Sequence, residues 1–118
     1  MKSERQRTML IVADMIISGE KEGPILPSPK IVGMVAAGTN AVCFDEAVCT
    51  LMGFDPCKIP TIHQARQSRG RFPLVDCKEP VSLISNIKAL DGREIASLKK
   101  SELLQFEPTR GWKGFIEL

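Results

Sequence analysis

The sequence predicts one α/β domain spanning residues 1–118, in which two or three helices pack on a small mixed sheet. Two nearly continuous apolar runs, 8–17 and 30–37, have the length and composition of buried strands. The second run leads into 41–53, where apolar residues recur at helical spacing. A chain of 118 residues that is 43% hydrophobic is long enough to bury a core of its own.

Glycine, proline and capping residues set the expected bounds of these elements. Segment 18–29 contains two glycines and three prolines, so it is predicted to be a loop or an extended crossing segment, whereas 30–37 is expected to be a central strand. Thr39 or Asn40 can cap the helix by accepting a hydrogen bond from its free N–H groups. Gly53 can end the same helix in a left-handed conformation.

The second half of the chain is expected to contain shorter elements. A short helix is predicted over 61–68, with Thr61 as its cap and Gly70 closing it. Residues 81–87 have the pattern of a strand, and Asp91-Gly92 is a turn signal that is compatible with a hairpin.

The end of the chain is expected to add one more helix and an edge strand. Ser97 or Ser101 can cap a short helix, which must end before Pro108. Residues 112–118 alternate loosely, as an edge strand does. Trp112 is interpreted either as an aromatic plug over the core or as an exposed contact for a partner.

Charge and composition argue against nucleic-acid and membrane partners. The formal net charge is only +2, most positive charges are scattered, and tyrosine is absent, so no base-stacking surface is expected. The apolar run near the N-terminus is too short to span a bilayer and is interrupted by Asp14. The expected compartment is the cytoplasm.

The four cysteines are expected to be reduced and to pack as small apolar side chains, because no secretory context favours disulfides. None of them belongs to a C-x-x-C pair, so no iron–sulfur cluster is expected in this chain, and metal ligation is the less favoured alternative. They are Cys43, Cys49, Cys57 and Cys77.

Asp45 is the first candidate for chemistry. At about 100° per residue it falls within the apolar arc of the helix at 41–53, so it is expected to face the core and to need a partner, a cation or a proton. Asp14, inside an apolar run, is the second candidate. The two carboxylates could bind Mg²⁺ or Ca²⁺ or share a proton; alternatively, each is hydrogen-bonded separately and only fixes packing.

The loop around Glu20 is the third candidate. Gly19 and Gly23 could shape a ligand pocket, with Glu20 or Glu22 as acid or ligand, although the loop lacks the G-K-[ST] ending of a P-loop. A plain solvated loop is the alternative. His63 is the only histidine and the natural choice for a general base, or else a structural or exposed residue.

Three segments of the first half resemble a known family: Ile11-Val12-Ala13-Asp14, Gly38-Thr39-Asn40-Ala41-Val42-Cys43-Phe44-Asp45 and, most specifically, Leu51-Met52-Gly53-Phe54-Asp55-Pro56. Over residues 8–62 the chain is similar to the C-terminal part of the family called domain of unknown function 362, uncharacterised proteins of bacteria and archaea. The resemblance implies that the family's recurring polar and glycine positions are Asp14, Glu20, Gly23, Asn40 and Asp45.

The resemblance implies no established reaction. Some family members carry a ferredoxin-like cluster domain, and others accompany surface-polysaccharide genes. Members are commonly longer at the N-terminus, so this chain resembles the C-terminal module of a longer protein. It departs from the family at Met15, Ser18 and Lys21, where glycine is usual, and the missing glycines imply a stiffer loop. It also has Ala41 where the family usually has proline.

Two hypotheses about function follow. The first is an acidic ligand- or divalent-metal-binding module acting on an anionic or carbohydrate-linked substrate. Its catalytic and metal candidates are Asp14 and Asp45, with Mg²⁺ or another divalent cation as cofactor, and its ligand-binding candidates are Glu20, Gly23 and Asn40. The second is a non-catalytic interaction domain. It would form a homo-oligomer, or dock on an iron–sulfur or redox protein or on a partner that supplies the missing N-terminal half.

Overall fold

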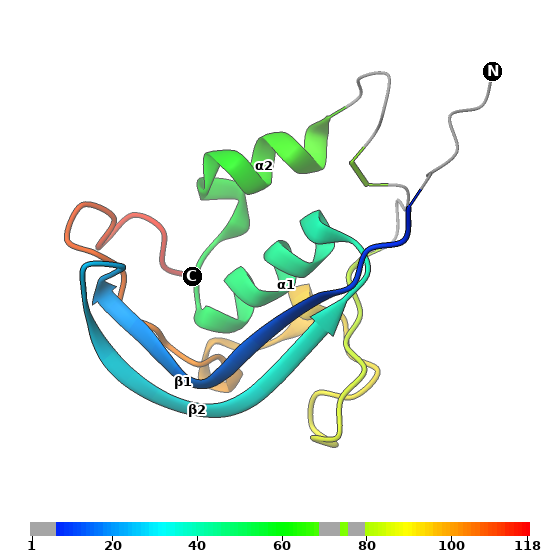
Figure 1. The fold of residues 1–118 in the computed structure, drawn as a ribbon, viewed down its shortest axis with the longest axis horizontal. Helices are drawn as coiled ribbons and strands as arrows, with labels where there is room; N and C mark the ends of the chain where they lie inside the picture. The colour runs from blue at the N-terminus through cyan, green and yellow to red at the C-terminus, as the bar shows by residue number, and fades with distance from the viewer. Residues whose placement is uncertain (1–6, 69–73, 76–79) are drawn as a thin grey trace.

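A long curved hairpin wraps around one side of a helix in the computed structural model, which describes residues 7–68, 74–75 and 80–118. The hairpin consists of β1 (Ile11–Glu22) and β2 (Leu26–Gly38), and the helices of the described residues are α1 (Ala41–Met52) and α2 (Pro60–Gln67). Figure 1 shows α1 on the concave side of the hairpin, with α2 beyond it. The expected α/β class is confirmed.

A bulge in the middle of the hairpin produces its bend. Met15 pairs with Met34, but the next pair is Ile17 with Ile31, so two residues of β2 oppose the single residue Ile16 of β1. One of the two is Gly33, whose φ of +72° lies in the left-handed region that glycine adopts without strain. Bulges increase the local bend and twist of a strand, which here lets the hairpin follow the helix (Figure 1).

The glycine- and proline-containing segment was expected to be a loop, and this prediction is wrong for most of it. Residues 18–22 continue β1 and 26–29 begin β2, so only 23–25 form the turn. Proline is tolerated here because β2 is an edge strand: within the described residues it pairs with β1 alone. For the same reason, β2 is not the expected central strand.

The strands are also less buried than their apolar composition predicts. The inner face of the hairpin contacts the core, for example through Val32. The outer face is open among the described residues: Ile31 is 84% exposed, and Ile17 opposite it is also exposed. A continuous apolar run usually indicates burial on both faces, but this hairpin buries only one.

Helix α1 begins and ends where its capping residues predict. The side-chain Oδ1 of Asn40 accepts a hydrogen bond from the Cys43 N–H at 3.0 Å. Gly53 ends the helix at φ +94°, and its N–H bonds back to the carbonyls of the last turn. Helix α2 instead begins directly at Pro60, so Thr61 is not its cap; proline at the first helical position already has the required φ. Gly70 lies outside the described residues.

The C-terminal third forms little regular structure. The strands predicted at 81–87 and 112–118 reduce to single bridges, Ser82 with Glu94 and Phe54 with Glu117. The predicted late helix reduces to the one-turn 3₁₀ helices Ile95–Ser97 and Lys100–Glu102; a third, Pro56–Lys58, precedes α2. Around the Asp91-Gly92 turn the chain does pair with itself as expected: Ile95 N–H donates to the Val81 carbonyl at 2.8 Å and Leu83 N–H to the Arg93 carbonyl at 2.9 Å, but the pairing is too short to form a named strand. The expected edge strand and late helix do not form, because the segment from Leu104 onward bonds to the end of α1.

Hydrogen bonds from the C-terminal segment satisfy the end of α1. Leu104 N–H donates to the Leu51 carbonyl and Phe106 N–H to the Met52 carbonyl, both at 2.8 Å, and Leu118 N–H donates to the Gly53 carbonyl at 3.0 Å. The last carbonyls of a helix have no partner within the helix, so this segment supplies the missing donors. The buried side chains that accompany it include Leu103, Phe106 and Ile116.

Among the described residues, no helix has the length and apolar character needed to cross a bilayer.

Replacing Asn40 by alanine should lower the free energy of unfolding by about 1 kcal/mol, because the Cys43 N–H loses its capping acceptor and the exposed Leu74 carbonyl loses the Asn40 amide donor. Urea unfolding followed by circular dichroism measures this difference. Asn86→Ala, at an exposed bend outside the helices, is the control and should stay near the wild-type value. Equal losses in the two variants would contradict the capping role.

Candidate functional site: a pocket at the hairpin tip

A pocket of about 360 Å³ lies between the turn end of the hairpin and the C-terminal segment. Its walls are mainly apolar, and its rim carries Glu20, Lys21 and Glu107. This size falls within the range of about 300–1,000 Å³ that small-molecule sites occupy. The apolar wall residues are Met52, Phe54, Ile59, Phe106, Trp112 and Ile116.

Local structure explains why the hairpin can approach the pocket closely. Gly19 and Gly23 both line it and present no side chain. A Cβ added to Gly19 would lie 2.8 Å from the Cβ of Pro27 on the facing strand, which is too close for any side chain without movement. Glycine at this position therefore allows the two strands to close beside the pocket.

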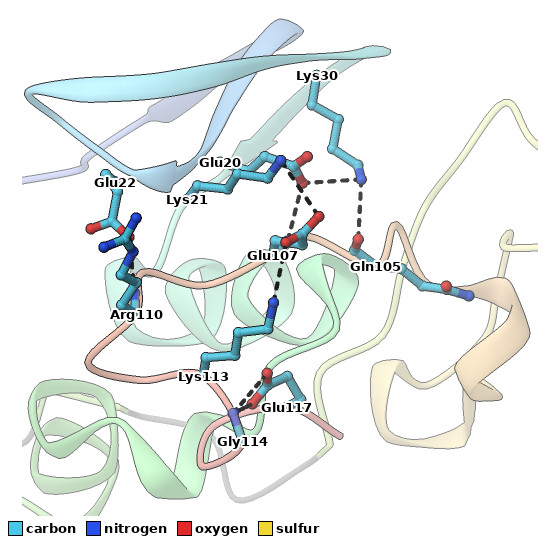
Figure 2. A network of polar contacts seen from close by, with 10 residues as sticks. All are labelled: Glu20, Lys21, Glu22, Lys30, Gln105, Glu107, Arg110, Lys113, Gly114 and Glu117. Atoms are coloured by element: carbon cyan, nitrogen blue, oxygen red, sulfur yellow. Dashed lines mark hydrogen bonds and ion pairs between the residues drawn. The ribbon is translucent and has the colours of Figure 1, made fainter.

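Glu20 is the least exposed charge at the rim. Its Oε2 accepts a hydrogen bond from the Glu107 N–H at 3.0 Å and one from Lys30 Nζ at 3.2 Å. Lys30 Nζ also donates to the Gln105 carbonyl at 3.0 Å (Figure 2). The same nitrogen lies 5.1 Å from the centre of the Phe106 ring. The Glu20 side chain is only 13% exposed, so these contacts are partly shielded from water.

The ionised form of Glu20 is favoured. Desolvation by burial acts to raise the pKa of its carboxyl group, but the Glu107 N–H and the Lys30 ammonium group together outweigh it, and the pKa lies below its ordinary value of 4.5. Glu20 is therefore an anion at neutral pH and a weak proton acceptor.

The remaining rim charges are also paired. Lys21 Nζ lies 3.6 Å from one carboxylate oxygen of Glu107, and Lys113 Nζ lies 3.5 Å from the other. Glu22 Oε1 accepts from the Arg110 N–H at 3.2 Å. Exposed ion pairs contribute little individually. Together with the 2.9 Å bond from the Lys21 N–H to the Glu107 carbonyl, they hold the tip against the C-terminal segment (Figure 2).

Of the five site residues in the first hypothesis, Glu20 and Gly23 both line the pocket, together with Gly19 of the same predicted loop. The other three are not among its lining residues. Asn40 caps α1. Asp14 is exposed, and its Oδ1 accepts from the Ile16 N–H at 2.9 Å, beside the bulge.

The expectation that Asp45 faces the core is wrong, because its side chain is exposed. Helix α1 carries apolar residues on nearly every side, so its sequence does not define which arc is buried. The packed arc includes Thr50, which is buried although polar. The acid on that side is Glu46, whose Oε2 is buried and lies 3.5 Å from Nη1 of Arg66 on α2.

Within the described ranges, no three side chains of His, Cys, Asp or Glu lie close enough together to hold a metal ion. A metal bound by Asp14 and Asp45 stays a prediction from the sequence. His63 lies half-buried in α2 and is not one of the pocket-lining residues.

Cys49 behaves as the sequence predicts, as a buried apolar side chain. Burial raises the pKa of its thiol to about 12, and its Sγ donates to the Phe54 carbonyl at 3.6 Å. A thiol that stays protonated is a poor nucleophile and a poor metal ligand. Cys57 is exposed and forms no disulfide, and Cys77 lies outside the described residues.

Sequence reasoning missed Lys30, Phe106 and Glu107. The contact between Glu20 and the Glu107 N–H joins residues 87 positions apart, and a backbone donor has no signature in the sequence. Trp112 was left open between a plug and an exposed contact; it lines the pocket and is 40% exposed.

No model of a known protein family, no curated protein and no solved structure matches this chain. The resemblance to the family called domain of unknown function 362 stays a prediction.

The lowered pKa of Glu20 predicts an acid-dependent loss of stability. A carboxyl group whose pKa is lower in the folded state stabilises the fold above its unfolded value near 4.5, and this contribution disappears as the pH falls through the folded value. Between neutral pH and pH about 3, wild type should therefore lose more unfolding free energy than Glu20→Gln.

Urea unfolding at a series of pH values measures the difference. Glu102 and Glu117 also have lowered pKa values, held down mainly by hydrogen bonds, but both are present in the two proteins, so the comparison isolates Glu20. Glu94→Gln, at an exposed glutamate, controls for the loss of one carboxylate. If the unfolding free energies of wild type and Glu20→Gln fall in parallel with pH, the lowered pKa of Glu20 in the folded state is refuted.

Proposed function

We propose that this domain is a non-catalytic binding module whose pocket at the hairpin tip takes an apolar group of its ligand. The observation that carries the proposal is a pocket of about 360 Å³ with aromatic and aliphatic walls. Phe54, Phe106 and Trp112 provide large apolar surfaces, and burying an apolar group against them contributes about 0.8 kcal/mol per CH₂.

The charge pattern supports an uncharged group in the pocket over the anionic or carbohydrate-linked substrate expected from the sequence. Glu20 is neutralised by Lys30, and Glu107 lies between Lys21 and Lys113. An ionic ligand would have to displace one of these partners, and the displaced group would lose its own ion pair. An apolar group leaves the rim as it is.

The residues beside the pocket are better suited to binding than to catalysis. A general base needs a pKa near the working pH, whereas the pKa of Glu20 is lowered. The carboxylate of Glu107 is held by two ammonium groups. The buried thiol of Cys49 stays protonated. Glu20 instead serves to fix the backbone of residue 107 and thereby the shape of the pocket.

Trp112 provides the test, because it is the chain's single tryptophan and lines the pocket. The neutral dye N-phenyl-1-naphthylamine should bind saturably and quench Trp112 emission. Its anionic analogue 8-anilinonaphthalene-1-sulfonate should bind more weakly. The cations that the structure describes beside the pocket are already paired with carboxylates, so a sulfonate would have to compete for them.

Thr109→Phe should weaken binding of the neutral dye by about tenfold or more, since the new ring occupies pocket volume. Thr39→Phe adds the same ring at an exposed position between β2 and α1 and is the matched control, with wild-type affinity expected. Equal affinity of the two variants, or stronger binding of the anionic dye by wild type, would overturn the proposed function.

A further inference from the structure

The tip of the hairpin presents two large aliphatic side chains to solvent, from the last residue of the turn and the first residue of β2. Ile25 is 93% exposed and Leu26 is 76% exposed. Tight turns usually carry glycine, proline or small polar residues. Exposing two apolar side chains to water is unfavourable in free energy, so their position calls for a binding partner. Gly23, two positions before Ile25, lines the pocket, so this apolar tip is adjacent to the cavity.

Exposed aromatic side chains extend the apolar surface on the other side of the pocket. Trp112, a wall residue, has its ring centre 6.2 Å from that of Phe115, which is 56% exposed. The hairpin tip and the loop that carries Trp112 lie side by side in Figure 1, and the Arg110 N–H bond to Glu22 joins them. We call the pocket with Ile25, Leu26, Trp112 and Phe115 the tip surface.

We propose that two copies of this chain associate through their tip surfaces, with Ile25 and Leu26 of each copy filling the pocket of the other. The proposal rests on the proposed function, because it needs a pocket that accepts apolar groups. Because Ile25 and Leu26 protrude beside an apolar pocket, the same surface carries both the group that binds and the cavity that receives it. A twofold axis through such a surface closes the assembly, since each contact is made twice.

The charges around the tip surface fit a second copy. Lys21, Arg110 and Lys113 alternate with Glu22 and Glu107, and each is exposed. When a surface faces its own copy, a cluster of one sign repels itself, whereas a set of both signs can place cations opposite carboxylates. The mixed rim is therefore compatible with self-association.

A second exposed apolar region competes with the tip surface as an explanation of any dimer. The outer face of the hairpin exposes Ile17, Ile31 and Val35, but the pocket is not part of it. Variants on the two surfaces therefore separate the alternatives, and both Ile25 and Ile31 are exposed enough to be replaced without disturbing the core.

Sedimentation equilibrium of the full chain between roughly 1 μM and 1 mM measures the association. Wild type should form a concentration-dependent dimer. Ile25→Asp and Thr109→Phe should each raise the dissociation constant by about tenfold or more, and Ile31→Asp should leave it within about twofold. A wild-type monomer throughout the range, or a dimer weakened by Ile31→Asp and not by Ile25→Asp, would overturn the proposal.

Dye binding distinguishes failure of this proposal from failure of the proposed function. Monomeric Ile25→Asp should still bind N-phenyl-1-naphthylamine, because its pocket is intact. The apparent dye affinity of wild type should fall as protein concentration rises, while that of Ile25→Asp stays constant. If wild type binds the dye at the pocket with an affinity that does not depend on protein concentration, the proposed binding function is supported and the proposed dimer is refuted. If neither protein binds it, the pocket itself is refuted.

Discussion

Three backbone hydrogen bonds at the C-terminal end of α1 organise the rest of this domain. The carbonyls of Leu51, Met52 and Gly53 would be unsatisfied at the end of a helix, and an otherwise irregular segment between Leu104 and Leu118 supplies their donors. Once the segment is held there, its side chains form the core with Cys49 and Phe54. An irregular segment can thus be well defined without being a helix or a strand.

The pocket results from a second attachment of the same segment. Glu20 accepts the N–H of Glu107, and Lys30 bridges Glu20 to the carbonyl of Gln105, so the hairpin tip is held at two neighbouring residues. The bulge opposite Ile16 bends the hairpin around α1 before it reaches this point. The space left between the two attachments is lined by aromatic and aliphatic side chains, and the apolar tip extends beyond it.

Sequence signals predicted the features that depend on residues close together in the chain, such as helix caps and helix ends. The cap at Asn40, the left-handed Gly53 and the α/β class are confirmed, because capping and glycine conformation involve residues only a few positions apart. The helix over 61–68 was placed within one residue of α2. Glu20 and Gly23 were found as a pair at one pocket because both lie in the same short stretch of chain.

The sequence by itself determined where α1 begins and ends, that two apolar extended segments precede it, and that a single domain forms. Only the tertiary structure decided which arc of α1 is buried, that Asp45 stays in water, and that Glu20 meets a backbone donor 87 positions away. The physical reason is that a helix apolar on nearly all sides has no preferred face of its own. Its buried arc is set by the distant side chains that pack on it, Phe106 and Ile116 against Cys49 and Ile95 against Ala47 and Leu51.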